Sequence, residues 1–286
     1  MTLEHPRIHW LADPAVLAPL LLLAGLYVWR FRQARREAGA RGASGWRALA
    51  FAGGFLALLG ALVTPVDGLG EDYLFSAHML QHVLLGDIAP LLILLSLSRV
   101  ILRPVTRRLM RVERALGPLA SPPVALLVWL GTMYLWHVPA LYDAAIRHPL
   151  LHALEHFSFF AAGVALWWPL VQPVPMRRGL SGMQPLAYIA AAKGGLAALG
   201  LFLAWSSTAH YPWYEDAPRI WGLSAVEDQN VAGVIMMVEQ SLTLVLVMVW
   251  LFTRMLSRSE EEEQRRERLD DSQVPASDVD VISTGS

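Results

Sequence analysis

Seven long stretches of mostly apolar residues constrain the fold of this chain more than any other feature. Each is about 16 to 25 residues long, close to the ~20 residues that a helix needs to cross a ~30 Å hydrocarbon layer. A segment inside a bilayer must satisfy its backbone hydrogen bonds internally, so each stretch predicts a helix. The predicted spans cover about residues 14–30, 47–64, 74–98, 122–137, 150–171, 185–206 and 229–253.

The composition supports this prediction and limits the possible chemistry. Hydrophobic residues make up 55% of the 286 residues and charged residues 16%, and the mean hydropathy is positive. The chain has no cysteine, which excludes disulfides, thiolate ligands and thiol nucleophiles. We predict an all-α, polytopic membrane bundle of about seven transmembrane helices, surrounded by membrane lipid and with no nucleic-acid partner.

The basic residues predict how the bundle is oriented. Arginines crowd the loops after the first, third, fifth and seventh predicted spans, whereas the opposite loops hold only Arg7, Arg147 and Arg219. Short loops rich in Lys and Arg stay in the cytoplasm, so we expect the N-terminus outside and the C-terminus in the cytoplasm. We therefore predict three parts of the chain. Residues 1–13 form an outer N-terminal segment, residues 14–256 form a seven-helix membrane domain, and residues 257–286 form a cytoplasmic tail that is predicted to be disordered.

All nine histidines lie on or near the outer side of this predicted topology. His78 and His82 open the third span, and His152 and His156 lie at the start of the fifth. Residues four apart share one face of a helix, and the rise per residue places His82 and His156 roughly 10 Å below the outer boundary. Two such helices packed side by side would present four imidazoles at one level.

Buried imidazoles need a partner for each polar ring. A shared metal meets that need, and so would a haem or a hydrogen-bond network that uses Gln81 and Glu155. Imidazole suits copper, zinc, iron and nickel, and the thioethers of Met79 and Met133 would favour Cu(I). Asp228 has an alternative role as the cap of the seventh predicted span. The candidate metal ligands are His78, His82, His137, His152 and His156, with His148, Asp228 and Met79 as further candidates.

Three charged residues lie deeper in the predicted bundle. Asp87 and Lys193 are about 20 Å below the outer surface by helix rise, and Glu239 lies inside the seventh span. An unpaired charge at such a depth is expensive, so we expect an ion pair of Lys193 with Asp87 or Glu239, and a proton or ion path is the alternative. His82 and Asp87 are five residues apart, which predicts different faces of one helix.

Five ordered motifs extend along the membrane domain. They are Ser76-Ala77-His78-Met79-Leu80-Gln81-His82, Trp136-His137-Val138-Pro139-Ala140-Leu141-Tyr142-Asp143, His152-Ala153-Leu154-Glu155-His156, Trp167-Trp168-Pro169, and Asp228-Gln229 followed by Ala232-Gly233. This set resembles the CtaG family, the assembly factors of caa3-type cytochrome c oxidases. The resemblance implies a seven-helix protein of the bacterial cytoplasmic membrane that helps to make an active haem–copper oxidase, with oxidase subunits as partners and copper as the metal it handles.

These observations define three function classes. The leading hypothesis is a non-enzymatic assembly factor that binds a copper ion through histidines near the outer membrane face and passes it to an oxidase subunit. A copper permease is the second, but it needs a polar route to the cytoplasm, and a cation at Lys193 would oppose metal passage. The third is a membrane metalloenzyme or a haem-binding protein, since histidines on two helices can ligate haem.

Overall fold

The computed structural model describes residue 10 and residues 13–271, and this part of the chain is helical without strands. The predicted outer segment lies mostly outside the described residues, as does the end of the predicted disordered tail, residues 272–286. The elements are α1 (Pro14–Gly42), α2 (Gly45–Leu62), α3 (Val66–Asp72), α4 (Phe75–Val83), η1 (Leu84–Ile88), α5 (Ala89–Ser96), α6 (Arg103–Leu116), η2 (Gly117–Ala120), α7 (Pro122–Trp136), α8 (Pro139–Arg147), α9 (Pro149–Val171), α10 (Gln184–Trp205), α11 (Pro212–Asp216) and α12 (Ala225–Asp271).

The long helices confirm the predicted bundle of about seven spans. Six are long and apolar enough to cross a membrane within the described ranges, and a seventh follows if α6, η2 and α7 form one span bent by 77°. The 15 residues of α7 would extend only about 22 Å, which explains why the fourth predicted span is the shortest. Large apolar side chains such as Leu49, Phe157 and Leu246 are exposed along these helices, as expected for surfaces that face lipid.

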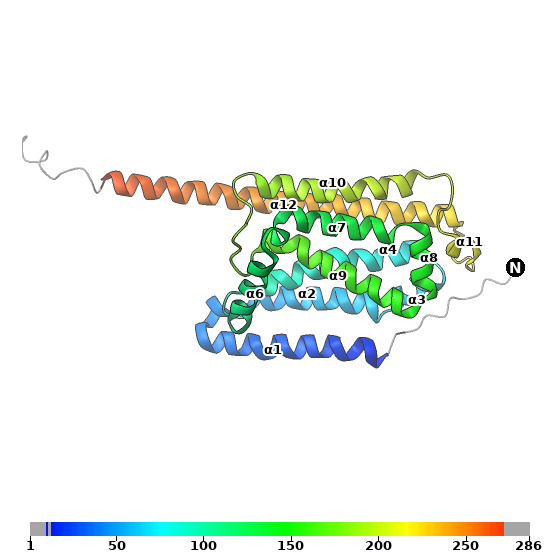
Figure 1. Cartoon of the computed structure of the whole chain (residues 1–286), viewed down its shortest axis with the longest axis horizontal. Helices are drawn as coiled ribbons and strands as arrows, with labels where there is room; N and C mark the ends of the chain where they lie inside the picture. Colours follow the sequence, from blue (N-terminus) through cyan, green and yellow to red (C-terminus); the bar gives the residue numbers. More distant parts are fainter. Residues whose placement is uncertain (1–9, 11–12, 272–286) are drawn as a thin grey trace, which may run out of the picture.

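The spans lie roughly parallel, and the short helices gather at the two ends (Figure 1). α6 crosses one end of the bundle, whereas α3, α8 and α11 lie at the other end (Figure 1). α12 leaves the bundle beside α6 and continues as one helix to Asp271, without a break at the predicted boundary after residue 256.

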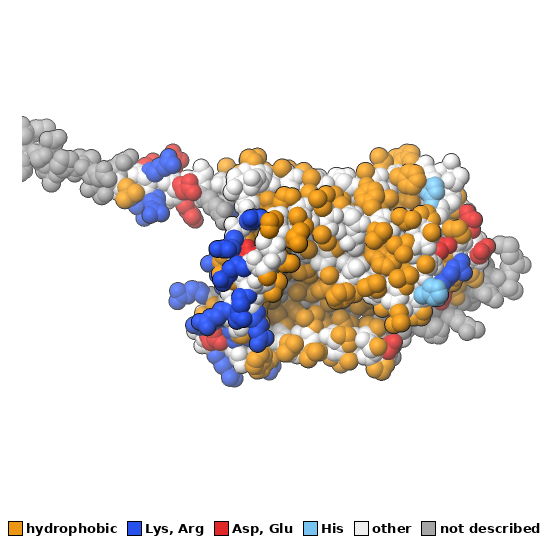
Figure 2. Space-filling view, viewed as in Figure 1, with side chains coloured by type: hydrophobic (Ala, Val, Ile, Leu, Met, Phe, Trp, Pro, Cys, Tyr) orange, Lys and Arg blue, Asp and Glu red, His pale blue; other side chains and the backbone are white. Residues whose placement is uncertain are grey.

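Charge differs between these two ends (Figure 2). Lys and Arg side chains gather around α6 and the turn between α1 and α2, which we call the arginine end. Acidic side chains and histidines lie at the opposite end with α3, α8 and α11, which we call the histidine end. This separation follows the alternate-loop pattern of the arginines, while the sidedness of the bundle in the membrane stays a prediction.

Helix α6 lies within the arginine-rich loop that the sequence predicts after the third span. Val105, Leu109 and Val112 recur at intervals of four and three residues between arginines, which is the pattern of an amphipathic helix. Its apolar face lines a cavity of about 330 Å³ together with Trp168 and Val174. The periodic signal was present in the sequence and could have identified the helix.

Close backbone contact positions α9 beside the third span. A Cβ atom added at Gly163 would lie 2.2 Å from the carbonyl oxygen of Gly86, a separation that no side chain tolerates. Small residues permit such close approach of helices in membranes. Gly163 therefore lets α9 pack closely against η1 and α5.

Candidate metal centre

His78 and His82 lie one turn apart on α4 and face the interior of the bundle. Their Nε2 atoms are 2.8 Å apart, and their ring centroids are 4.2 Å apart. Both residues are buried, and His78 is fully so. The spacing of four residues therefore brings the two rings together as the sequence predicts for a helix.

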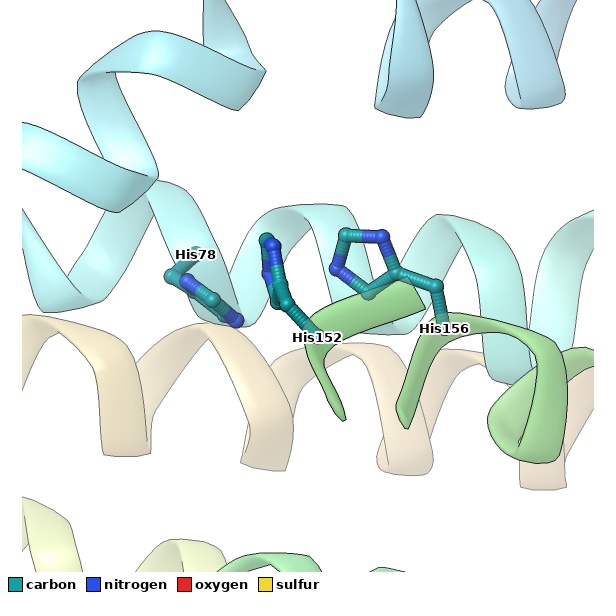
Figure 3. A group of neighbouring side chains, drawn as sticks. All are labelled: His78, His152 and His156. Atoms are coloured by element: carbon teal, nitrogen blue, oxygen red, sulfur yellow. The ribbon is translucent and has the colours of Figure 1, made fainter. Parts of the chain in front are cut away.

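Helix α9 supplies a second pair of imidazoles that faces the first. The rings of His152 and His156 are 4.1 Å apart between centroids. Both project from α9 toward α4, into the space that His78 enters from the other side (Figure 3). The ring centroids of His78 and His152 are 5.3 Å apart, and those of His82 and His156 are 5.6 Å apart. The structure thus brings four of the five predicted ligands, all except His137, into one group.

Glu155 adds a carboxylate to this group. The residue has no exposed surface, and neither side-chain oxygen has a hydrogen-bond partner within the described part of the chain. Its Oε1 lies 3.7 Å from Nε2 of His82. The sequence predicts a place for Glu155 in a hydrogen-bond network and not among the metal ligands. The missing hydrogen bonds depend on how the helices pack, which the sequence pattern does not reveal. We call His78, His82, His152, Glu155 and His156 the histidine–glutamate cluster.

The cluster has the donor atoms of a metal site. Among the described residues, His82 Nδ1, His152 Nε2 and His156 Nε2 are buried without a hydrogen-bond partner. One possible ligand atom from each of His78, His152 and His156 lies within 4.8 Å of the other two. The same holds for one ligand atom from each of His78, His82 and Glu155. Each buried polar atom without a partner costs about 1–3 kcal/mol. A single cation would satisfy several of them at once.

Surrounding groups orient the cluster's rings. Nδ1 of His152 lies 2.9 Å from Oε1 of Glu71, whose side chain is 41% exposed. The Tyr214 hydroxyl donates to the carbonyl of Gly70 at 2.6 Å and lies 3.4 Å from Nδ1 of His78. Carboxylate or carbonyl partners on the second ring nitrogen are typical of metal-binding histidines. The His152–Glu71 contact leaves Nε2 of His152 available as a ligand.

Tyrosines close the histidine end over the cluster. Tyr142 on α8 and Tyr214 on α11 share a hydrogen bond of 2.9 Å between their hydroxyls. Burial raises the pKa of both phenols well above the usual value, so both remain protonated. Burial also raises the pKa of the nearby Asp143 carboxyl. These buried, neutral phenols therefore add hydrogen-bonding groups next to the cluster without adding charge.

Two further candidates lie outside the cluster. His148 is exposed and precedes α9, where its carbonyl accepts from the amide of His152 at 3.0 Å. Asp228 accepts from the amides of Phe75 and Ser76 at 2.6 and 3.2 Å. It therefore caps α4, and the alternative expectation that it caps its own helix is wrong. The carboxylate of Asp228 lies at the positive end of α4, where negative charge is stabilising.

His137 and Met79 form a separate contact beside the cluster. His137 follows the last residue of α7, and its Nδ1 lies 2.7 Å from the carbonyl oxygen of Met133. Its Nε2 lies 3.3 Å from Sδ of Met79. Both residues line a small cavity, of about 20 Å³, that also has His82 in its wall. His137 is thus linked to the cluster through a shared cavity rather than as one of the grouped ligands.

The three deep charges meet in the bundle interior. The Lys193 ammonium contacts Asp87 directly and lies 3.6 Å from Oε1 of Glu239. Nε1 of Trp167 donates to Asp87 at 2.8 Å, and the ammonium lies 5.1 Å from the centroid of that ring. The structure pairs Lys193 with both candidate carboxylates. We call Asp87, Lys193 and Glu239 the charge triad.

A π-helical turn changes the predicted relation between His82 and Asp87. Residues Leu84–Ile88 form this turn, in which hydrogen bonds join residues five apart. His82 and Asp87 both line the same small cavity. The sequence expectation that they do not share a face assumed a regular α-helix, which this turn interrupts.

The fold and the site define a polytopic helical membrane protein whose histidine end encloses a buried group of imidazoles and one carboxylate. Comparison with known families gives a more specific assignment. Residues 25–258 match the profile of the family described as "Cytochrome c oxidase caa3 assembly factor (Caa3_CtaG)", and the chain belongs to this family. The resemblance seen in the sequence motifs is confirmed.

Curated relatives come from mycobacteria. An uncharacterized protein of Mycobacterium leprae is 24% identical over 295 residues, which cover 96% of this chain and 43% of the relative. Uncharacterized proteins of Mycobacterium bovis and Mycobacterium tuberculosis show the same identity and coverage over 300 residues. The chain therefore spans less than half the length of these relatives. No solved structure matches it.

Proposed function

We propose that this member of the caa3 oxidase assembly factor family binds copper at the histidine–glutamate cluster and passes it to an oxidase subunit. The observation that carries this proposal is the buried carboxylate of Glu155, which lies among four imidazoles and has no hydrogen bond to any described residue. Imidazole and carboxylate suit a divalent transition metal, and copper heads the usual affinity order for such ligands. Copper is the cargo in this role, and the protein performs no catalytic step.

The location of the cluster supports release by ligand exchange. Glu71 contacts His152 and is partly exposed, so a path from the histidine end to the cluster passes this pair. We infer that this end faces the outside of the bacterial cytoplasmic membrane, because the arginine end has the charge of cytoplasmic loops. An oxidase subunit in the same membrane would take the ion there.

The geometry disfavours a haem protein and a permease. The ring centroids of His78 and His152, on facing helices, are 5.3 Å apart, and those of His82 and His156 are 5.6 Å apart, which leaves little room for a porphyrin between the helices. A permease would need further free ligands toward the cytoplasm, but the carboxylates of Asp87 and Glu239 are already paired with Lys193.

Copper content of variants tests the proposal. The full chain is purified in detergent, loaded with Cu(II) and measured by elemental mass spectrometry. We expect the double variants His78→Ala/His82→Ala and His152→Ala/His156→Ala to lose the copper held by the wild type. His148→Ala is the matched control, because that imidazole is exposed outside the cluster.

The same variants are expressed in cells that lack the native chain, and the copper content and activity of the oxidase are measured. Loss of both in the cluster variants, with retention in His148→Ala, supports delivery to the oxidase. Helical content and thermal unfolding identify any variant that fails to fold. Unchanged copper content and normal oxidase maturation in a folded cluster variant would refute the proposal.

A further inference from the structure

The contact between His137 and Met79 has an unusual pairing of atoms. Nδ1 of His137 lies 2.7 Å from the carbonyl oxygen of Met133. A carbonyl only accepts, so Nδ1 must carry the hydrogen. In a neutral imidazole the other nitrogen, Nε2, then presents a lone pair. That lone pair faces Sδ of Met79 at 3.3 Å, and a thioether sulfur has no hydrogen to donate.

A cation between the two atoms resolves this contact. The alternative is a doubly protonated ring, which would place a positive charge in buried surroundings. Of the described residues that line the cavity beside His137, Asp87 is the one with a carboxylate. Asp87 already accepts hydrogen bonds from Lys193 and Trp167, so its carboxylate does not offset a positive charge on the His137 ring. A soft metal ion shared by nitrogen and sulfur needs no such charge on the ring.

The cavity has the size and lining that a single ion requires. Its volume of about 20 Å³ exceeds the ~10–15 Å³ that one water-sized occupant needs. Met79, Met133 and Met236 line it together with His82 and His137. Thioethers select Cu(I), and no other common biological metal prefers them to the same degree. We call this space the methionine cavity.

Nearby groups hold these ligands in place. A Cβ atom at Gly86 would lie 3.0 Å from the methyl carbon of Met133, so the absence of a side chain there leaves room for Met133. The hydrogen bond from Nδ1 of His137 to a backbone carbonyl fixes the tautomer that presents Nε2, which is a common arrangement for metal-bound histidine.

We propose that His137 and Met79, with Met133 and Met236, form a second site that binds monovalent copper. This inference rests on the proposed function, because it assigns a second binding site to the copper that the protein is proposed to deliver. His82 belongs to the histidine–glutamate cluster and also lines the methionine cavity, so the two sites share a wall. Imidazole binds copper in either oxidation state, so an ion that reaches the cluster as Cu(I) would pass His82 to the thioethers without a change of oxidation state. A Cu(II) ion would stay at the imidazoles and the carboxylate, because no reductant is part of this proposal.

X-ray absorption of selenomethionine-labelled protein tests the ligands directly. The purified full chain is loaded with one equivalent of Cu(I) under anaerobic conditions, and scattering is recorded at the copper and selenium edges. We expect copper–selenium scattering in the wild type. Met79→Leu, which nearly conserves side-chain volume, should reduce or abolish it. Met248→Leu should leave it unchanged, because Met248 is 36% exposed on α12.

Affinity provides a second measurement. Competition with a chromophoric Cu(I) chelator should show binding that is about tenfold weaker or worse in Met79→Leu and in Met236→Leu. Met248→Leu should match the wild type. Absence of copper–selenium scattering, together with an unchanged Cu(I) affinity in Met79→Leu, would overturn the second site and leave the methionines as packing residues.

The variant His152→Ala/His156→Ala separates this inference from the proposed function. If both hold, this variant loses copper at the imidazoles but keeps copper–selenium scattering. If the cluster does not bind copper, the variant behaves as the wild type while Met79→Leu still loses Cu(I). If the methionine cavity does not bind copper, only the cluster variant changes.

Discussion

Replacement of Lys193 with methionine removes the cation that Asp87 and Glu239 both contact in the bundle interior. The Lys193 side chain is fully buried, and those of Asp87 and Glu239 are 4% and 10% exposed. Removal of one partner from a buried ion pair costs about 3–5 kcal/mol, since the remaining charge has no compensation. Here two carboxylates remain, so we expect the upper part of that range. At ~2–4 °C per kcal/mol, a loss of about 4–5 kcal/mol should lower the unfolding midpoint by roughly 8 to 20 °C.

The order of the variants tests the reasoning more sharply than any single value. Asp87→Asn should cost less than Lys193→Met, because the ammonium keeps Glu239 as a partner at 3.6 Å. The combination of Lys193→Met with Asp87→Asn and Glu239→Gln removes all three charges and should recover much of the loss. The assay is thermal unfolding of the purified protein in one detergent, followed by intrinsic tryptophan fluorescence.

Two results would contradict the charge triad as a structural element. One is an unfolding midpoint of Lys193→Met within 2 °C of the wild type, against the roughly 8 °C minimum expected above. The other is a larger loss in Asp87→Asn than in Lys193→Met. Normal stability combined with loss of oxidase maturation would instead favour the proton or ion path.

Three further predictions concern the cluster and its packing. Glu155→Gln keeps the side-chain shape but removes the carboxylate, and it should weaken Cu(II) binding about 10- to 100-fold in a chelator competition; an unchanged affinity would exclude the carboxylate as a ligand. Gly163→Ala places a Cβ 2.2 Å from the Gly86 carbonyl oxygen, so it should lower the free energy of unfolding by about 1–3 kcal/mol and reduce copper content. Copper affinity should fall as the pH is lowered, because protons compete for the imidazole nitrogens; a flat profile would contradict imidazole ligation.

Sequence patterns that depend on regular helix geometry predicted most of the fold and the site. The seven spans follow from apolar stretches, because a bilayer forces each stretch into a helix. The pairs on α4 and α9 follow from spacings of four residues, which place His78 beside His82 and His152 beside His156. The prediction that both pairs lie at one level needed only their positions relative to the span ends.

Features that depend on packing between helices were beyond the sequence. Glu155 is adjacent to His156 in the chain, but its lack of a hydrogen-bond partner among the described residues depends on how α9 packs against the neighbouring helices. The role of Asp228 as a cap for α4 joins residues more than 150 positions apart. Neither relation leaves a periodic signal. The π-helical turn also lacks one, and it contains Asp87, which lines the same cavity as His82.

The sites follow one another along the third span. The histidine–glutamate cluster comes first from the histidine end, the methionine cavity follows, and the charge triad comes after it. Asp87 lines the cavity and bonds to Lys193, so the ammonium stands at the inner end of this series. Imidazoles and thioethers attract copper, whereas the carboxylates of Asp87 and Glu239 are already paired with Lys193 and offer the ion no free ligand.

An ion that enters from the histidine end therefore meets favourable ligands and then a barrier. Under the proposed function, a protein with this order would hold copper and return it to the side from which it came, as an assembly factor does and a permease does not. Vesicles that contain the purified protein should accordingly bind copper without accumulating it in the lumen. Accumulation that depends on His82 would show that Lys193 is no barrier and would reverse this conclusion.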